Sequence, residues 1–133
     1  MMEIIDKLVD SGAPLSKVVR LYDKELGDDN GAFELTFAGN VISLLAMEDD
    51  SISLIIGTLE ELNDLSKQDV SRSNVWKSAI GKPLSWGWLL TNNRGYSDSI
   101  QLHFSDGIFD MGFTLQLLVE CSSLKIRAVI DIE

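Results

Sequence analysis

The feature that most constrains the fold is a pair of alternating apolar and polar runs within residues 81–104. The runs at 84–91 and 96–104 have the period of two that is typical of strands with one buried face. The four residues between 91 and 96 are Asn, Asn, Arg and Gly, a group rich in residues that tolerate the positive φ of a tight connection. This stretch therefore predicts a β-hairpin.

Similar alternation recurs along the whole chain, with polar or glycine-containing turns between the runs. The spacing predicts short helices at 3–10, 58–65 and 75–80, and a loop at 66–73. Strands are predicted at 15–22, 33–37, 41–47, 52–56, 84–91, 96–104, 113–121 and 124–132. We therefore predict an α+β fold, mostly antiparallel, with about eight strands in a sandwich or strongly curved sheet and two or three short helices.

A short motif occurs twice and indicates an internal repeat. Residues 12–16 and 81–85 agree at four of five positions, and both prolines of the chain lie in these copies. Each copy follows a predicted helix and precedes a predicted strand. At 133 residues the chain has the length of one domain with one core. We expect a single domain built from two similar units of one helix and four strands, residues 3–57 and 74–132, joined by 58–73.

Charge narrows the choice of partners. The net charge of −10 argues against nucleic acid and anionic membranes as ligands. Residues 1–66 hold fourteen Asp and Glu against four Lys and Arg, whereas residues 67–133 hold seven of each. Two interpretations are open: a solvated acidic face, or an electrostatic docking surface for a basic protein partner. The candidates for that surface are Asp28, Asp29, Glu48, Asp49 and Asp50.

Catalytic and metal-binding patterns are not evident in the sequence. The single histidine, His103, is expected on the sheet surface, and the single cysteine, Cys121, is expected to be buried. No phosphate loop and no metal-ligand spacing is found. We expect no enzymatic activity, no cofactor and no metal. The acidic N-terminus, the single cysteine and apolar runs shorter than the roughly 18 residues of a membrane span lead us to expect a cytoplasmic protein.

Aromatic and polar residues gather on the predicted hairpin. As structural residues, the two tryptophans would pack under the sheet and the others would build the turn. As functional residues, they would line a sugar-like pocket or anchor a protein interface. The candidates are Trp86, Trp88, Asn92, Arg94, Tyr96 and Asp98.

The same region carries a family resemblance. Trp76, the stretch 81–88 with its Trp-x-Trp ending, and the Asn-x-x-Gly-Tyr-x-Asp pattern at 92–98 resemble the core of a small uncharacterised family of bacterial proteins, a domain of unknown function. The resemblance covers residues 76–104 and implies a small bacterial cytoplasmic protein with no established activity and no assigned catalytic residues. Size and charge alone also make the chain similar to immunity proteins that neutralise toxins.

These observations lead to two functional hypotheses. The first is a non-enzymatic binding module, similar to immunity proteins, whose acidic first half docks a basic protein partner. The alternative is a module that binds a small, sugar-like ligand at the hairpin of Trp86, Trp88 and Tyr96. Self-association through exposed strand edges is a further expectation.

Overall fold

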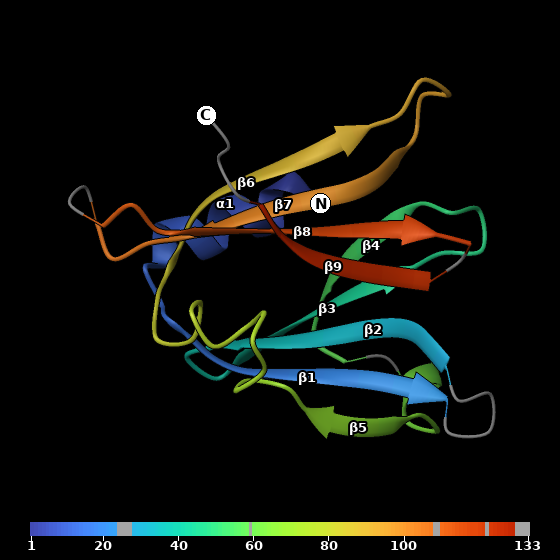
Figure 1. Ribbon diagram of the computed structural model, residues 1–133, viewed down its shortest axis with the longest axis horizontal. Coiled ribbons are helices and arrows are strands. Elements are labelled where there is room, and N and C mark those ends of the chain that lie inside the picture. The colour runs from blue at the N-terminus through green and yellow to red at the C-terminus, as the bar shows by residue number, and fades with distance from the viewer. Residues whose placement is uncertain (24–27, 59, 108–109, 122, 130–133) are drawn as a thin grey trace.

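The computed structural model describes residues 1–23, 28–58, 60–107, 110–121 and 123–129. These residues form nine strands in two antiparallel sheets, with one α-helix, and the sheets lie as two layers (Figure 1). In chain order the elements are α1 (Met2–Ser11), β1 (Leu15–Asp23), β2 (Asp28–Phe37), β3 (Asn40–Ala46), β4 (Ile52–Ile56), the 3₁₀ turn η1 (Glu60–Leu62), β5 (Ser66–Asp69), β6 (Leu84–Thr91), β7 (Ser97–Phe104), β8 (Phe113–Glu120) and β9 (Ser123–Val129).

Both sheets are built around a four-stranded meander. The first sheet has the order β4-β3-β2-β1-β5, and the second has the order β6-β7-β8-β9. The predicted hairpin at 84–104 is confirmed as β6 and β7. Its tip reaches away from the other strands (Figure 1).

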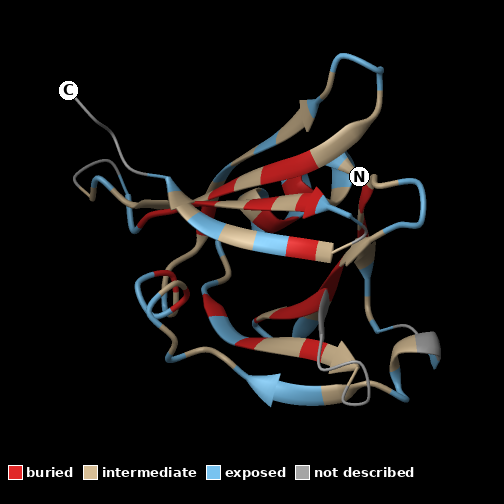
Figure 2. Cartoon of the chain, turned by 45° about the vertical axis from the view of Figure 1, so that its right-hand side comes forward, coloured by how far each residue is buried: buried red, intermediate tan, exposed pale blue. Residues whose placement is uncertain are grey.

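The core lies between the two sheets, because each strand turns one row of apolar side chains toward the opposite layer. Buried positions recur along strands of both sheets (Figure 2). The helix α1 adds Ile5 and Leu8 to this core and contacts β6 and β4, which are edge strands of the two sheets. The fully buried strand residues include Leu35 and Leu44 from the first sheet, and Ile100, Leu115 and Leu117 from the second.

Helix α1 packs against β6 at Gly87. A Cβ atom at this position would lie 2.6 Å from Cγ2 of Ile5, closer than real Cβ contacts allow. Glycine between the two tryptophans therefore lets the helix pack directly on the inner side of β6.

The two copies of the repeated motif lie against each other. Pro14 and Pro83 form an antiparallel bridge. The N–H of Leu15 donates to the carbonyl of Lys82 at 2.9 Å, and the N–H of Gly81 donates to the carbonyl of Leu15 at 2.7 Å. Two related units could pair with each other in this way. The duplication itself is not tested by these contacts and stays a prediction.

The predicted numbers of helices and strands are wrong: the sequence predicts two or three helices and about eight strands, whereas the described residues form one α-helix and nine strands. Residues 75–80 form hydrogen-bonded turns rather than an α-helix, and the predicted helix at 58–65 contains only the 3₁₀ turn Glu60–Leu62. Six residues are too few to offset the cost of helix nucleation, and here Trp76 and Ala79 are instead buried in the core. The described part of the second half thus has no α-helix, so the two halves are not equal helix-plus-four-strand units.

One strand, β5, lies where the sequence predicts a loop. Ser66–Asp69 pairs antiparallel with β1, with Tyr22 opposite Ser66 and Val19 opposite Asp69. The segment has no apolar alternation because its side chains are mostly exposed at the edge of the sheet. Backbone hydrogen bonds to β1, which side-chain patterns do not report, make it a strand.

Candidate functional site

Trp86 and Trp88 point away from the core. Their exposed fractions are 63% and 46%, although Leu84 on the same strand is only 2% exposed. Simple alternation would place all three side chains on one face. A shift in the pairing between Leu84 and Trp86 breaks that alternation, because Leu84 pairs with Phe104 while Trp86 pairs with His103. This bulge at Ser85 turns both indoles outward.

The two tryptophans begin two rows of side chains across the outer side of the second sheet. One row runs from Trp86 through His103 and Thr114 to Val129, and the other from Trp88 through Gln101 and Gln116 to Arg127. We call these eight residues the Trp face. It is aromatic at the β6 edge, rich in hydrogen-bonding groups in the middle, and basic and aliphatic at β9.

Hydrogen bonds fix the middle of the Trp face. His103, half-buried, shares a hydrogen bond of 2.7 Å between its Nδ1 and Oγ1 of Thr114. The amide of Gln116 donates to Oγ of Ser99 at 3.0 Å. At the β9 edge, Glu120 lies 3.5 Å from Nζ of Lys125 and 4.0 Å from a guanidinium nitrogen of Arg127. The face is therefore an ordered platform with both aromatic and polar parts.

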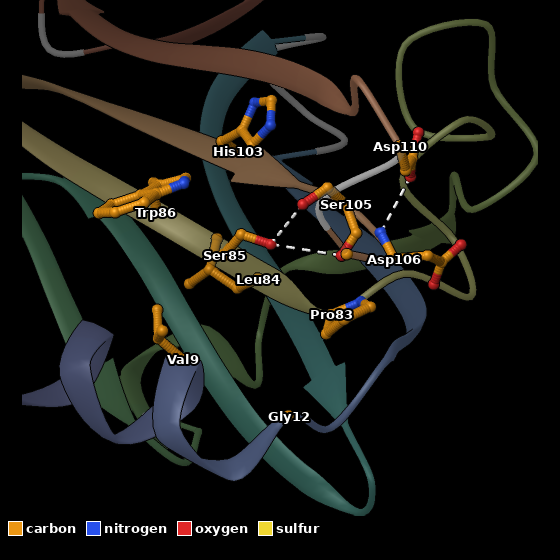
Figure 3. Close-up of a pocket in the computed structure, with 11 residues that line it drawn as sticks. Val9, Gly12, Pro83, Leu84, Ser85, Trp86, His103, Ser105, Asp106 and Asp110 are labelled. Carbon is orange, nitrogen blue, oxygen red and sulfur yellow. Dashed lines mark hydrogen bonds between the residues drawn. The ribbon is translucent and has the colours of Figure 1, made fainter.

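A cleft of about 570 Å³ adjoins the Trp face at Trp86 (Figure 3). Its lining combines the indole and His103 with the hydroxyls of Ser85 and Ser105, whose oxygens lie 2.6 Å apart. Val9 and Gly12 from α1 and its C-terminus line the other side. An aromatic wall beside convergent hydroxyl and imidazole groups is typical of small-ligand sites.

Carboxylates lie at the far side of this cleft. Asp110 accepts hydrogen bonds from Nζ of Lys82 at 2.8 Å and from the N–H groups of Asp106 and Gly112 at 2.9 and 3.0 Å. The hydrogen bond from Lys82, followed by the two backbone N–H groups, holds the pKa of Asp110 well below its usual range. Asp110 therefore shapes the rim as a carboxylate, while the side chain of Asp106 is exposed.

The other hairpin candidates build the turn. The N–H of Arg94 donates to Oδ1 of Asn92 at 2.9 Å, and the amide of Asn92 donates to Asp98 at 3.3 Å. The N–H of Asn92 also donates to the carbonyl of Tyr96 at 2.9 Å. At about 3.3 Å per residue, the end of β6 lies roughly 16 Å from Trp86. The structure therefore brings Trp86 and Trp88 together on the outer side of β6, and it separates Trp86 from Asn92, Arg94, Tyr96 and Asp98 at the tip of the hairpin.

The acidic candidates are only partly described. Glu48 and Asp49 are exposed in the turn between β3 and β4, and Asp50 follows at intermediate exposure. Asp49 accepts hydrogen bonds from the hydroxyl and the N–H of Ser51, which lower its pKa. The side chains of Asp28 and Asp29 lie outside the described residues, although their backbone belongs to β2.

Sequence reasoning missed most of the cleft. Ser85, Ser105 and Asp106 carry no motif of their own, and only the repeated Gly-x-Pro-Leu-Ser stretch drew attention to Ser85. The predicted burial of Cys121 is wrong, because the strand ends one residue earlier and Cys121 occupies the turn, exposed and with φ of 51°. In the part of the chain that the structure describes, no group of three His, Cys, Asp or Glu residues has the arrangement of a metal site.

The fold and the site together define a class: a two-sheet antiparallel β protein with an aromatic-walled cleft at the edge of the second sheet. The chain belongs to a family of unknown function, DUF6334, whose model matches residues 1–133. The resemblance to a domain of unknown function is thereby confirmed over the whole chain rather than over 76–104, while the bacterial origin stays a prediction. No curated protein and no solved structure matches the chain. Within the described residues, no helix combines the length and apolarity needed to cross a membrane.

Proposed function

We propose that this protein is a non-enzymatic, cytoplasmic binding module whose ligand is a small polyhydroxylated, sugar-like molecule held in the Trp86 cleft. The observation that carries the proposal is the outward exposure of Trp86 beside a cleft with hydroxyl, imidazole and carboxylate groups. An indole offers a flat apolar platform to the C–H face of a sugar ring, and the polar groups suit its hydroxyls.

A ligand in this cleft should change the fluorescence of the exposed tryptophans. We expect one of a set of defined oligosaccharides, such as cellotriose, maltotriose and chitotriose, to shift the emission on titration. Replacing Trp86 with Ala should weaken binding about tenfold, since losing an aromatic anchor costs on the order of 1–2 kcal/mol. Trp88→Ala is the matched control, because Trp88 does not line the cleft.

The third tryptophan makes the readout specific. Trp76 is 1% exposed and should contribute a constant background. A Trp86→Ala protein that still binds with wild-type affinity would exclude the cleft as the site. The absence of any fluorescence or thermal shift with every sugar tested would contradict the choice of ligand.

A second candidate function is docking of a basic protein partner on the first half. A cleft of about 550 Å³ is lined by apolar Leu45, Met47 and Leu62 together with Glu48 and Asp49. Met47 is 42% exposed, and residues 25–66 contain ten Asp and Glu but no Lys or Arg. An apolar cleft lined also by two exposed carboxylates complements a basic amphipathic segment.

This candidate predicts strongly salt-dependent binding. A synthetic amphipathic peptide of Leu and Lys should bind at low salt and lose most of its affinity by about 0.5 M salt, where the Debye length is only a few Å. Calorimetry with the corresponding Leu and Glu peptide is the negative control. Glu48→Lys should weaken binding more than Asp6→Lys on the exposed side of α1, and binding that is insensitive to salt would rule out the electrostatic mechanism.

A further inference from the structure

A separate cleft of about 430 Å³ lies between the first sheet and strand β9. Its apolar lining includes Phe33 from β2 and Leu124 from β9, and its polar lining includes Arg20, Ser73, Trp76 and Lys125. These residues come from β1, β2, the turns after β5, and β9, so only the folded chain brings them together. None of them belongs to the Trp face or to the Trp86 cleft.

The charge of this cleft is opposite to that of the protein. Two of its described lining residues are cationic and none is acidic, although the whole chain carries a net charge of −10. Cζ of Arg20 lies 5.5 Å from the centroid of the Tyr22 ring. Lys125 lies at the rim with 58% of its side chain exposed, and its Nζ is 3.5 Å from Glu120. Arg20 and Lys125 thus offer two cationic groups to an anion in this cleft, with the carboxylate of Glu120 beside Lys125.

Trp76 supplies a second, independent observation. The residue is 1% exposed and packs on Phe33 with the ring centroids 5.7 Å apart. Its Nε1 is the one buried side-chain nitrogen or oxygen among the described residues that has no hydrogen-bond partner. Leaving a buried donor unsatisfied costs about 1–3 kcal/mol, and Trp76 lines this cleft, so an acceptor that reached the indole N–H from the cleft would stabilise the structure.

We propose that this cleft binds a small organic anion with an apolar body, of the size of an aromatic carboxylate or phosphate ester. The anionic group lies toward Arg20 and Lys125 and accepts the indole N–H of Trp76, and the apolar body packs on Phe33 and Leu124. Charge-assisted hydrogen bonds from a guanidinium select the anion, while the apolar walls select the body. Neither the sugar nor the basic-peptide function is required for this site.

The test uses the indole N–H signals of the three tryptophans in a ¹H–¹⁵N spectrum of the full chain. The probes are benzoate, phenyl phosphate and neutral benzamide, which share one ring and differ in charge. We expect the Trp76 signal, assigned with Trp76→Phe, to move with at least one anion at millimolar concentration. Binding of benzamide should be at least about tenfold weaker, and the preferred anion distinguishes a carboxylate from a phosphate ligand.

Two arginine variants locate the anion. Arg20→Gln should lower the affinity for the preferred anion about tenfold, whereas Arg94→Gln, which removes an exposed guanidinium at the hairpin tip, should leave it unchanged. Equal binding of benzamide, no movement of the Trp76 signal with either anion, or unchanged affinity in Arg20→Gln would each overturn the proposal. The comparison of benzoate with benzamide uses the wild-type protein, so it tests the proposal even if a variant fails to fold.

Discussion

Replacing Gly112 with Ala is expected to lower the free energy of unfolding by about 3 kcal/mol. Gly112 has φ of +74°, a conformation that costs an L-residue roughly 1–2 kcal/mol. A Cβ atom there would also lie 2.7 Å from the carbonyl oxygen of Phe104 and against the ring of His103. Overpacking of this kind adds about 1–3 kcal/mol. Since the backbone of Phe104 is held in β7, the neighbour cannot give way easily.

The matched control is Gly95→Ala. Gly95 has φ of +90°, yet a Cβ atom there would meet nothing within 4 Å. Its cost should therefore be the conformational part alone, about 1 kcal/mol. Urea denaturation followed by far-UV circular dichroism measures both. Equal losses in the two variants would show that the close contacts of Gly112 contribute nothing, and His103→Ala should recover part of the loss only in the Gly112 variant.

The sequence predicted strands better than helices, for a physical reason. In 100–104 the apolar residues alternate because the strand has one buried face, and in 33–37 they alternate although Glu34 between them is also buried. In both segments the period of two is visible locally. The segments 58–65 and 75–80 have good local helix signals but are too short to form helices without tertiary support. Ser66–Asp69 is a strand only because β1 offers a free edge, which no local pattern records.

The sequence predicted which residues stand out at the candidate site, but it did not predict how their side chains are arranged in space. Trp86 and Trp88 stood out as aromatic residues beside turn residues, but their direction depends on the bulge at Ser85. A change of one residue in register turns a whole run to the opposite face. The Trp86 cleft joins Val9, Ser85 and Asp106, and the cleft beside β9 joins Arg20, Trp76 and Lys125, in each case from segments far apart in the chain. Only the pairing of the strands determines these neighbours.

The contact between Phe37 and Phe104 is expected to be among the most stabilising in the protein. Each ring is at most 1% exposed, they stack with centroids 6.4 Å apart at 10°, and they belong to different sheets. Phe37→Ala or Phe104→Ala should each cost about 3–5 kcal/mol, because a large cavity is left between two sheets that cannot fully collapse. Such a loss is a large part of the roughly 5–15 kcal/mol that stabilises a typical domain.

A double-mutant cycle separates the stack from general burial. Leu is the better replacement for the cycle, because it keeps most of the apolar volume and the protein folded. The coupling free energy between Phe37→Leu and Phe104→Leu should be about 0.5–1.5 kcal/mol, and strictly additive losses would contradict a specific ring contact. Because the pair joins the two sheets, both halves should unfold in one transition. All three tryptophans lie in residues 76–88, so their fluorescence reports on the second half of the chain. This fluorescence should therefore change at the same urea concentration as the circular dichroism signal. Two separate midpoints would contradict the single domain.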